Sequence, residues 1–461
     1  RLEEKYVMAF TAINPATGER MQIHASWNAA QLEAALQQTA DVTSAWAAEP
    51  LTARTALLRR AGAALLAHRD EYAELMSKEM GKLIGEARAE IEKCARCCTY
   101  YADHAAQMLA DEPARTDAAT SYVAYQPLGT VLAIMPWNFP FWQAIRAAAP
   151  ALTAGNTMLL KHADNVPGCA LALEQVFREA GYPEGVFRSL MIGIPMVDGV
   201  IRDTRIAAVT LTGSERAGRA VGQAAGDTLK KCVLELGGSD AFVVLEDADL
   251  AQAADVGAKS RYQNAGQSCI AAKRFIVVDS IADAFLEGFL ARAQTLKPGD
   301  PMHFQTTLAP MARFDLRETL HEQVQDAVQK GARPLLGCEP VSGKGAFYPA
   351  SILDGVAPGM RAWDEELFGP VASIIRVHDE AEALQIANGS AYGLGGSVWT
   401  RDRKRGEAFA LQLRSGSAFV NGLVKSDPRL PFGGIGRSGY GRELARHGIH
   451  EFTNVKTVWI G

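Results

Sequence analysis

The sequence VLAIMPWNFPFWQAIRAAAPALTAGNTMLL, residues 131–160, sets the fold class. Its apolar run at 131–135 precedes a helical pattern near 141–152, and a second apolar run follows at 157–160. A short strand, a helix and another short strand in this order are typical of a parallel sheet covered by helices. Arg146 is the only charge in the stretch, but the prolines and asparagines within it argue against a membrane span.

The alternation of short apolar strands with helices continues along most of the chain. The first unit continues with a helix at 167–180, strands at 186–191 and 206–211, a helix at 215–225 and a strand at 232–236. A second unit follows, with strands at 241–245, 273–278, 371–377, 394–400 and 418–421 and helices at 250–262, 281–293 and 380–387. The pattern predicts an α/β protein with a doubly wound, Rossmann-like sheet and a second α/β domain. Ligands of such sheets bind at the carboxyl ends of the strands.

The flanking segments carry other patterns. Residues 29–108 have helical periodicity, 122–125 reads as an isolated strand, and 452–460 is a β-like tail. Residues 1–7 precede Met8, a candidate native start, and we exclude them from the fold prediction.

Composition limits the function classes. At 461 residues the chain suggests roughly two to four domains. The net charge of −5, with no dense basic cluster beyond 401–405, gives no sign of a nucleic-acid partner, so a small molecule is expected. Seven scattered cysteines indicate a reduced, cytoplasmic protein. Cys94, Cys97 and Cys98 resemble a metal or redox set, but nothing completes it, so we predict a buried helix face and no metal.

A thiol and a carboxylate stand where predicted segments change and side chains face a cleft. Cys269 ends the motif Gly266-Gln-Ser-Cys269 between a helix and a strand, and is the candidate nucleophile. A free thiol has a pKa of about 8.5, so it needs a base or a dipole to react near neutrality. Glu235 closes a strand just before Gly237 and Gly238, which let the backbone turn, and it is the candidate base.

Further candidates each have a plainer structural alternative. Asn138 offers an amide N–H to a developing oxyanion, or forms a turn before a helix. The segment Thr212–Gly218 follows a strand and starts a helix, which suits a phosphate, or it is an ordinary turn capped by Ser214. Lys161 and Asp164 at another strand end hold ribose hydroxyls, or are charges that face water.

Together the motifs resemble the aldehyde dehydrogenase superfamily. They appear in the family's order: Pro136-Trp-Asn-Phe-Pro140, Gly213-Ser214 with Gly218, Glu235-Leu-Gly-Gly238, Gly266-Gln-Ser-Cys269, Glu366-Leu-Phe-Gly-Pro370 and Pro431-Phe-Gly-Gly434. The separation of Glu235 and Cys269 also fits, and the match runs from Ile13-Asn-Pro-Ala-Thr-Gly18 to the tail. The chain is most similar to short bacterial succinate semialdehyde dehydrogenases.

The resemblance implies three domains and an oxidation chemistry. The domains are an NAD(P)-binding domain at 8–106 and 130–236, a catalytic domain at 237–436, and a small β domain at 107–129 and 437–461 that pairs subunits as a homodimer or homotetramer. The implied chemistry oxidises an aldehyde to its acid through a thiohemiacetal and a thioester on Cys269. Glu235 is then the base, and Asn138 with the Cys269 backbone N–H is the oxyanion hole. The implied cofactor residues are Trp137, Lys161, Asp164, Gly213, Ser214, Gly218, Glu366 and Phe368.

The aldehyde is expected to carry a far carboxylate. Arg146 stands eight residues after Asn138, where succinate semialdehyde dehydrogenases have an arginine and relatives that act on neutral aldehydes have an aromatic residue. A guanidinium in an apolar wall is costly unless it meets a carboxylate. We therefore expect Arg146 to clamp an anionic substrate, with Gln143, Lys425 and Ser426 as helpers. The alternative is an ion pair between Arg146 and an internal glutamate.

Some residues depart from the family pattern. Gln263 stands where some succinate semialdehyde dehydrogenases have a second arginine, so the carboxylate site is assembled differently. Asp164 would accept a hydrogen bond from a free ribose 2′-hydroxyl, which slightly favours NAD over NADP.

The rival interpretations are a broad-specificity aliphatic aldehyde dehydrogenase and a non-catalytic protein on the same scaffold.

Overall fold

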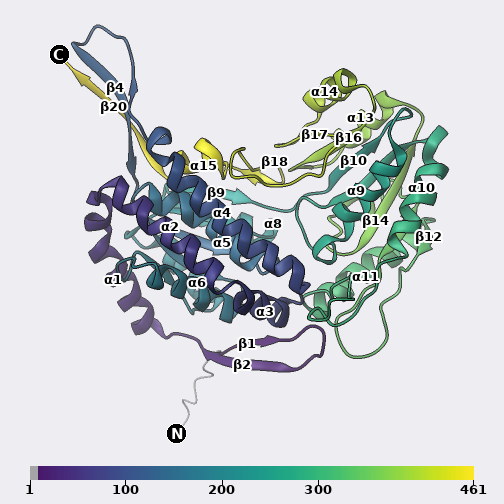
Figure 1. Ribbon diagram of the computed structural model, residues 1–461, viewed down its shortest axis with the longest axis horizontal. Helices are drawn as coiled ribbons and strands as arrows, with labels where there is room; N and C mark the ends of the chain where they lie inside the picture. Colours follow the sequence, from purple (N-terminus) through teal and green to yellow (C-terminus); the bar gives the residue numbers. More distant parts are fainter. Residues whose placement is uncertain (1–8) are drawn as a thin grey trace.

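The computed structural model describes residues 9–461, so Met8 and the seven residues before it lie outside the described part of the chain. Two α/β units lie beside each other, and a narrow β-ribbon projects from the first of them (Figure 1). The α/β class with a Rossmann-like sheet is confirmed.

The first unit is built on a six-stranded sheet in the order β19-β9-β8-β5-β6-β7. Its strands are β5 (Thr130–Met135), β6 (Thr157–His162), β7 (Phe187–Ser189), β8 (Ile206–Thr212), β9 (Lys231–Glu235) and β19 (Gly439–Tyr440). All neighbours pair in parallel except β19, which is antiparallel to β9. The strand order reverses at β5, because β6 and β7 follow on one side of it and β8 and β9 on the other. In doubly wound sheets the ligand crevice opens at this point of reversal.

Helices cover both faces of this sheet. They are α1 (Ala29–Ala48), α2 (Leu51–Ala67), α3 (Arg69–Met80), α4 (Ile84–Met108), α5 (Pro140–Thr153), α6 (Pro167–Glu179), α7 (Val197–Arg202), α8 (Glu215–Asp227) and α15 (Ala445–Glu451), with the short turn η1 (Ile194–Met196). Val131 and Ala133 of β5 join a core formed with α2 to α6, whereas Leu132 joins a second core formed with α1, α7 and α8. The alternation follows from the two-residue period of a strand, which sends successive side chains to opposite faces.

The second unit contains a seven-stranded sheet in the order β12-β13-β14-β11-β10-β16-β17. Its strands are β10 (Asp240–Val244), β11 (Ala272–Val278), β12 (Arg333–Leu336), β13 (Ser351–Asp354), β14 (Val371–Val377), β16 (Gly396–Trp399) and β17 (Phe419–Val420). Its helices and turns are α9 (Leu250–Tyr262), η2 (Gln263–Gly266), α10 (Asp279–Ala293), α11 (Phe314–Gln329), α12 (Arg361–Asp364), α13 (Glu380–Asn388) and α14 (Arg403–Gln412). A small antiparallel pair, β15 (Tyr392–Gly393) with β18 (Ile435–Gly436), lies beside it.

Two small sheets complete the fold. One joins β3 (Glu112–Pro113), β4 (Thr120–Pro127) and β20 (Thr453–Ile460), and the other pairs β1 (Ala9–Ile13) with β2 (Arg20–Ala25). The expectation that 122–125 is an isolated strand is wrong, because β4 pairs along its whole length with β20. Since β19 extends the first sheet, only the last part of the 437–461 segment belongs to the small sheet, and the domain division stays a prediction.

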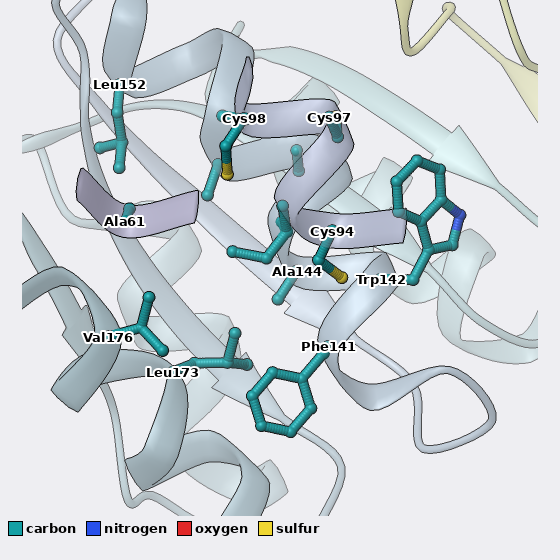
Figure 2. Close-up of a cluster of buried hydrophobic side chains, with 14 of the residues drawn as sticks. Ala61, Cys94, Cys97, Cys98, Phe141, Trp142, Ala144, Leu152, Leu173 and Val176 are labelled. Carbon is teal, nitrogen blue, oxygen red and sulfur yellow. The ribbon is translucent and has the colours of Figure 1, made fainter. Parts of the chain in front are cut away.

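The thiols of Cys94, Cys97 and Cys98 lie on one side of α4 in a buried cluster with Phe141 of α5 (Figure 2). All three cysteines are fully buried, as expected for a helix face packed into the core. Among residues 9–461 no helix is both long and apolar enough to cross a membrane.

Candidate active site

A cleft of about 850 Å³ opens at the carboxyl ends of β5, β6 and β8. Met135 and Lys161 line it from the ends of β5 and β6, α8 contributes Val221, and Phe314 closes it from the second unit. The position and size of the cleft suit a dinucleotide, which binds at this edge of doubly wound sheets. The buried amide nitrogen of Asn165, another lining residue, has no hydrogen-bond partner in the described part of the chain and offers a ligand a free donor.

Lys161 and Asp164 both line the cleft and bind each other. The Lys161 ammonium donates to the Asp164 carboxylate at 2.6 Å and to the main-chain carbonyl of His162 at 2.6 Å. Because the ion pair offsets the charge of Asp164, that carboxylate repels a 2′-phosphate less than a free one would. The argument from Asp164 for NAD over NADP is weakened accordingly.

The turn from β8 to α8 has the geometry of an ordinary helix start. The Ser214 hydroxyl accepts a hydrogen bond from the Ala217 N–H at 3.3 Å and so caps α8. A Cβ on Gly218 would come within 2.6 Å of the Leu236 side chain, so this glycine allows α8 to pack closely on the end of β9. Gly213, Ser214 and Gly218 are not among the cleft-lining residues, and their cofactor role stays a prediction.

The loop that carries Cys269 is shaped by a left-handed turn. Asn264, Ala265 and Gly266 have φ values of 52°, 53° and 71°, and they end α9 abruptly. A Cβ on Gly266 would lie 2.3 Å from the Gly369 carbonyl oxygen, so glycine is required on both conformational and steric grounds. The turn leaves the Cys269 side chain half-buried beside the core of the first unit.

Two hydrogen bonds hold Asn138 against this loop. Its side-chain nitrogen donates to the Gln267 carbonyl at 3.2 Å, and its own carbonyl accepts from the Asn264 side chain at 2.8 Å. A primary amide has two N–H donors, so one remains for another acceptor. An oxyanion hole needs such a free N–H, and the role of Asn138 stays a prediction.

A second network ties the loop to the predicted nicotinamide end. The Lys273 ammonium donates to the Cys269 carbonyl at 2.8 Å and pairs with Glu366 at 3.0 Å. Glu366 also accepts from the Gly238 N–H at 3.0 Å. Glu366 is thus fixed between the two motifs that carry Glu235 and Cys269. Nearby, the rings of Trp137 and Phe368 meet edge to face at 5.8 Å.

Glu235 lies in a buried cluster of charges at the end of β9. Neither of its carboxylate oxygens has a hydrogen-bond partner among residues 9–461. Burial and the nearby Glu443 carboxylate raise the pKa of Glu235 well above its ordinary value. Burial also raises the pKa of Glu443, which pairs with Arg146 at 2.5 Å. A carboxyl group whose pKa is raised above its ordinary value is suited to general acid–base work.

The thiol of Cys269 is protonated in this environment. Burial raises its pKa to about 12, although the charges of Arg146 and Lys273 act to lower it. Reaction near neutrality therefore needs conditions that favour the thiolate; the charges of Arg146 and Lys273 act in that direction, whereas the nearby Glu235 carboxylate acts against it. The candidate base ends β9 of the first sheet, the candidate nucleophile lies in the loop before β11 of the second, and their shared role stays a prediction.

The four predicted substrate residues differ in burial and in the contacts that they make. Arg146 is buried and paired with Glu443, which is the alternative left open by the sequence, so its clamp role stays a prediction. Gln143 is buried, and from Ala9 to the last residue nothing donates a hydrogen bond to its side-chain oxygen. Lys425 is exposed. Ser426 is buried, and its hydroxyl accepts a hydrogen bond from the Lys93 ammonium on α4 at 2.7 Å.

Four residues of the site were not predicted to have a role: Lys93, Asn264, Lys273 and Glu443. Asn264 could have been found, because an asparagine before Ala-Gly suits a left-handed turn. The others are single charges in helices, strands or loops, and only the folded chain shows what they contact.

Known proteins similar to this chain give its family. Residues 3–458 match the model of the aldehyde dehydrogenase family. The chain is 49% identical to the succinate semialdehyde dehydrogenase [NAD(P)+] Sad of Escherichia coli, with 97% of both chains covered. It is 48% identical to a probable succinate-semialdehyde dehydrogenase [NADP(+)] of Synechocystis, covering 98% of this chain and 100% of the relative. The crystal structure of the Streptococcus pyogenes succinic semialdehyde dehydrogenase with NADP+ superposes with a TM-score of 0.96 at 40% identity, covering 98% and 100%. The chain belongs to the aldehyde dehydrogenase family.

Proposed function

We propose that the protein oxidises succinate semialdehyde to succinate and uses NAD(P)+ as the hydride acceptor. The observation that carries the proposal is the hydrogen bond from the Asn138 amide to the Gln267 carbonyl, two residues before Cys269, together with Glu235, which is close enough to affect the pKa of the Cys269 thiol. Relatives that align over nearly the whole chain are named for this substrate, which supports the choice of aldehyde.

The residues divide the reaction into two steps. Cys269, once deprotonated, adds to the aldehyde carbon, and the free N–H of Asn138 stabilises the oxyanion of the resulting thiohemiacetal. The carbon loses a hydride and becomes a thioester; NAD(P)+ held in the cleft lined by Lys161 would supply the hydride acceptor. Glu235 then takes a proton from water, the hydroxide attacks the thioester carbon, and the C–S bond breaks as Glu235 passes that proton to the departing sulfur, which gives the acid and the free thiol.

We propose that both NAD+ and NADP+ are accepted. The Lys161–Asp164 ion pair offers a cation and a carboxylate at the same edge of the cleft. The relatives are named for NADP(+) or NAD(P)+, so the slight preference for NAD expected from the sequence has no support from them.

The test is the formation of reduced nicotinamide from succinate semialdehyde with each cofactor. Butanal is the neutral comparison substrate of equal carbon number, and Cys269→Ala is the control for the chemistry. We expect kcat/KM to be much higher for succinate semialdehyde than for butanal. Equal values would favour the broad-specificity alternative, and the absence of turnover with any aldehyde would favour a non-catalytic protein.

We also propose a homo-oligomer that assembles through the sheet of β3, β4 and β20, in a cytoplasmic protein. Val455, Trp459 and Ile460 on β20 are 60%, 54% and 50% exposed, which is unusual for large apolar side chains clustered on one strand. All seven cysteines are free, which fits a reducing compartment. Light scattering of wild type and Trp459→Glu would test the assembly, since a charge in an apolar interface favours smaller species.

A further inference from the structure

Lys273 on β11 is a buried cation whose hydrogen-bonding capacity is fully used. Its side chain is 1% exposed. The ammonium donates to the main-chain carbonyls of Ser268 and Cys269, each at 2.8 Å, and pairs with Glu366 at 3.0 Å. A lysine has three N–H donors, so these three partners leave none for a substrate. Lys273 is therefore held in one place, and it holds its partners in turn.

The partners of Lys273 come from segments that are far apart in the sequence. Ser268 and Cys269 lie in the loop before β11, and Glu366 lies in the loop between α12 and β14. Glu366 also accepts a hydrogen bond from the N–H of Gly238, in the turn after β9. A Cβ on Gly238 would lie 2.7 Å from the Cys269 carbonyl oxygen, so this turn packs directly on the backbone of Cys269. The Lys273 ammonium thus lies where three segments meet.

Lys273 fixes the direction of the Cys269 backbone N–H. The peptide bond between Ser268 and Cys269 is trans and planar, so its C=O and its N–H point in opposite directions. Because the Ser268 carbonyl points to the Lys273 ammonium, the Cys269 N–H points away from it. Among residues 9–461 nothing accepts a hydrogen bond from this N–H. It is a free donor on the residue that carries the candidate nucleophile.

A free N–H in this position is useful when the thiol adds to a carbonyl group. The aldehyde oxygen then becomes an oxyanion beside the backbone of the attacking residue. A donor stabilises this charge best when it is already aimed at it, because no free energy is then spent on reorientation during the reaction. The second carbonyl that Lys273 binds is that of Cys269 itself, so the peptide units on both sides of the Cys269 Cα are fixed.

We propose that Lys273 is a positioning residue, which holds the Cys269 backbone N–H ready for the oxyanion that forms when the thiol adds to the aldehyde. This inference rests on the proposed function and deepens it. Lys273 acts through the loop and does not touch the aldehyde, since its donors are all engaged. Its charge has a separate effect: burial raises the pKa of the Cys269 thiol, and the Lys273 ammonium acts to lower it.

Lys273→Met keeps the length of the side chain and removes both the charge and the donors. Two reactions of the thiol then separate the two effects, because oxidation of succinate semialdehyde develops an oxyanion and alkylation by iodoacetamide does not. With saturating semialdehyde and NAD(P)+, we expect the first-turnover rate of nicotinamide reduction to fall about 100-fold, as for a misplaced oxyanion donor. Without cofactor or aldehyde, alkylation at about pH 8 should fall at most about tenfold, which corresponds to a rise of one unit in the thiol pKa.

Arg274→Met is the matched control. Arg274 is the next residue on β11, is 4% exposed, and also donates to main-chain carbonyls, those of Ser239, Ile386 and Ala387. Its side chain points to the opposite face of the strand from that of Lys273. We expect Arg274→Met to lower the unfolding temperature but to keep the first-turnover rate within about threefold of wild type.

Lys273→Gln keeps an N–H₂ donor of shorter reach, so it should lose less rate than Lys273→Met, and it replaces that variant if methionine prevents folding. A first-turnover rate near that of wild type in the Lys273 variant would overturn the positioning role while the proposed function stands. Equal losses in the two thiol reactions would overturn it as well, because only the charge would then act. So would equal losses of rate in the Lys273 and Arg274 variants. If wild type oxidises no aldehyde, the proposed function fails and this inference fails with it.

Discussion

The Nε atom of Arg146 lies 2.5 Å from a carboxylate oxygen of Glu443, and both side chains are buried. The pair joins α5 to the loop between β19 and α15. Removing one partner leaves an uncompensated charge in the protein interior, whereas removing both does not.

We therefore expect Arg146→Ala and Glu443→Gln each to destabilise the protein by about 3–5 kcal/mol. The double variant should lose much less than the sum of the two. Thermal unfolding of all four proteins at one protein concentration measures this coupling. Losses that simply add would mean that the two charges act independently.

Glu235→Gln should stall the reaction after hydride transfer. The glutamine cannot deprotonate water, so the first turnover produces reduced nicotinamide and the thioester accumulates. Rapid mixing should show a burst close to one equivalent per subunit, followed by a steady rate about 10²- to 10⁴-fold below wild type. A steady rate near that of wild type would remove Glu235 from the hydrolytic step.

The acid limb of the pH–rate profile should lie above the ordinary range of glutamate. Burial and Glu443 raise the pKa of Glu235, and only its deprotonated form accepts a proton from water. As the pH falls through this raised pKa, kcat therefore falls. The profile of kcat with saturating succinate semialdehyde gives the position of the limb. A limb near pH 4, the value of an exposed glutamate, would contradict the assignment.

Asn264→Gly should reduce kcat without unfolding the protein. Glycine adopts the observed φ of 52° without strain, but it lacks the amide that holds the Asn138 carbonyl. A small misplacement of an oxyanion donor costs up to about 10²-fold in rate. Comparing kcat with the unfolding temperature separates positioning from stability. If the unfolding temperature falls together with kcat, Asn264 is a structural residue and not a positioning one.

Regular elements were predicted from the sequence where the apolar pattern is strong. The helix at 250–262 and the strand at 371–377 match α9 and β14 to the residue, because caps and apolar runs mark their ends. From 294 to 370 no element was predicted, although α11, β12, β13 and α12 lie there. β12 is a four-residue edge strand that is only partly buried, so it gives no clear pattern, whereas α11 is mostly polar but its buried residues Leu320, Val324 and Ala327 recur at helical spacing and could have been recognised.

The site was predictable where short motifs carry the chemistry, as for Cys269 and Glu235. It was not predictable where a charge finds its partner across the fold. The spacing that marked Arg146 gave no sign that Glu443 would neutralise it, and Lys93 has no motif around it. Ion pairs between distant segments depend on the assembled layers, which a linear pattern does not contain.

The pairing of β4 with β20 affects how the chain is made in the cell. The ribosome has completed β4 at residue 127, but β20, which pairs with β4 along its whole length, ends at residue 460. At roughly 5–20 residues per second, the ribosome needs tens of seconds to supply that neighbour. Throughout translation of the second unit, the nascent polypeptide carries an open strand edge of the kind that attracts other chains. Chaperone capture during synthesis is the natural remedy for such a delay.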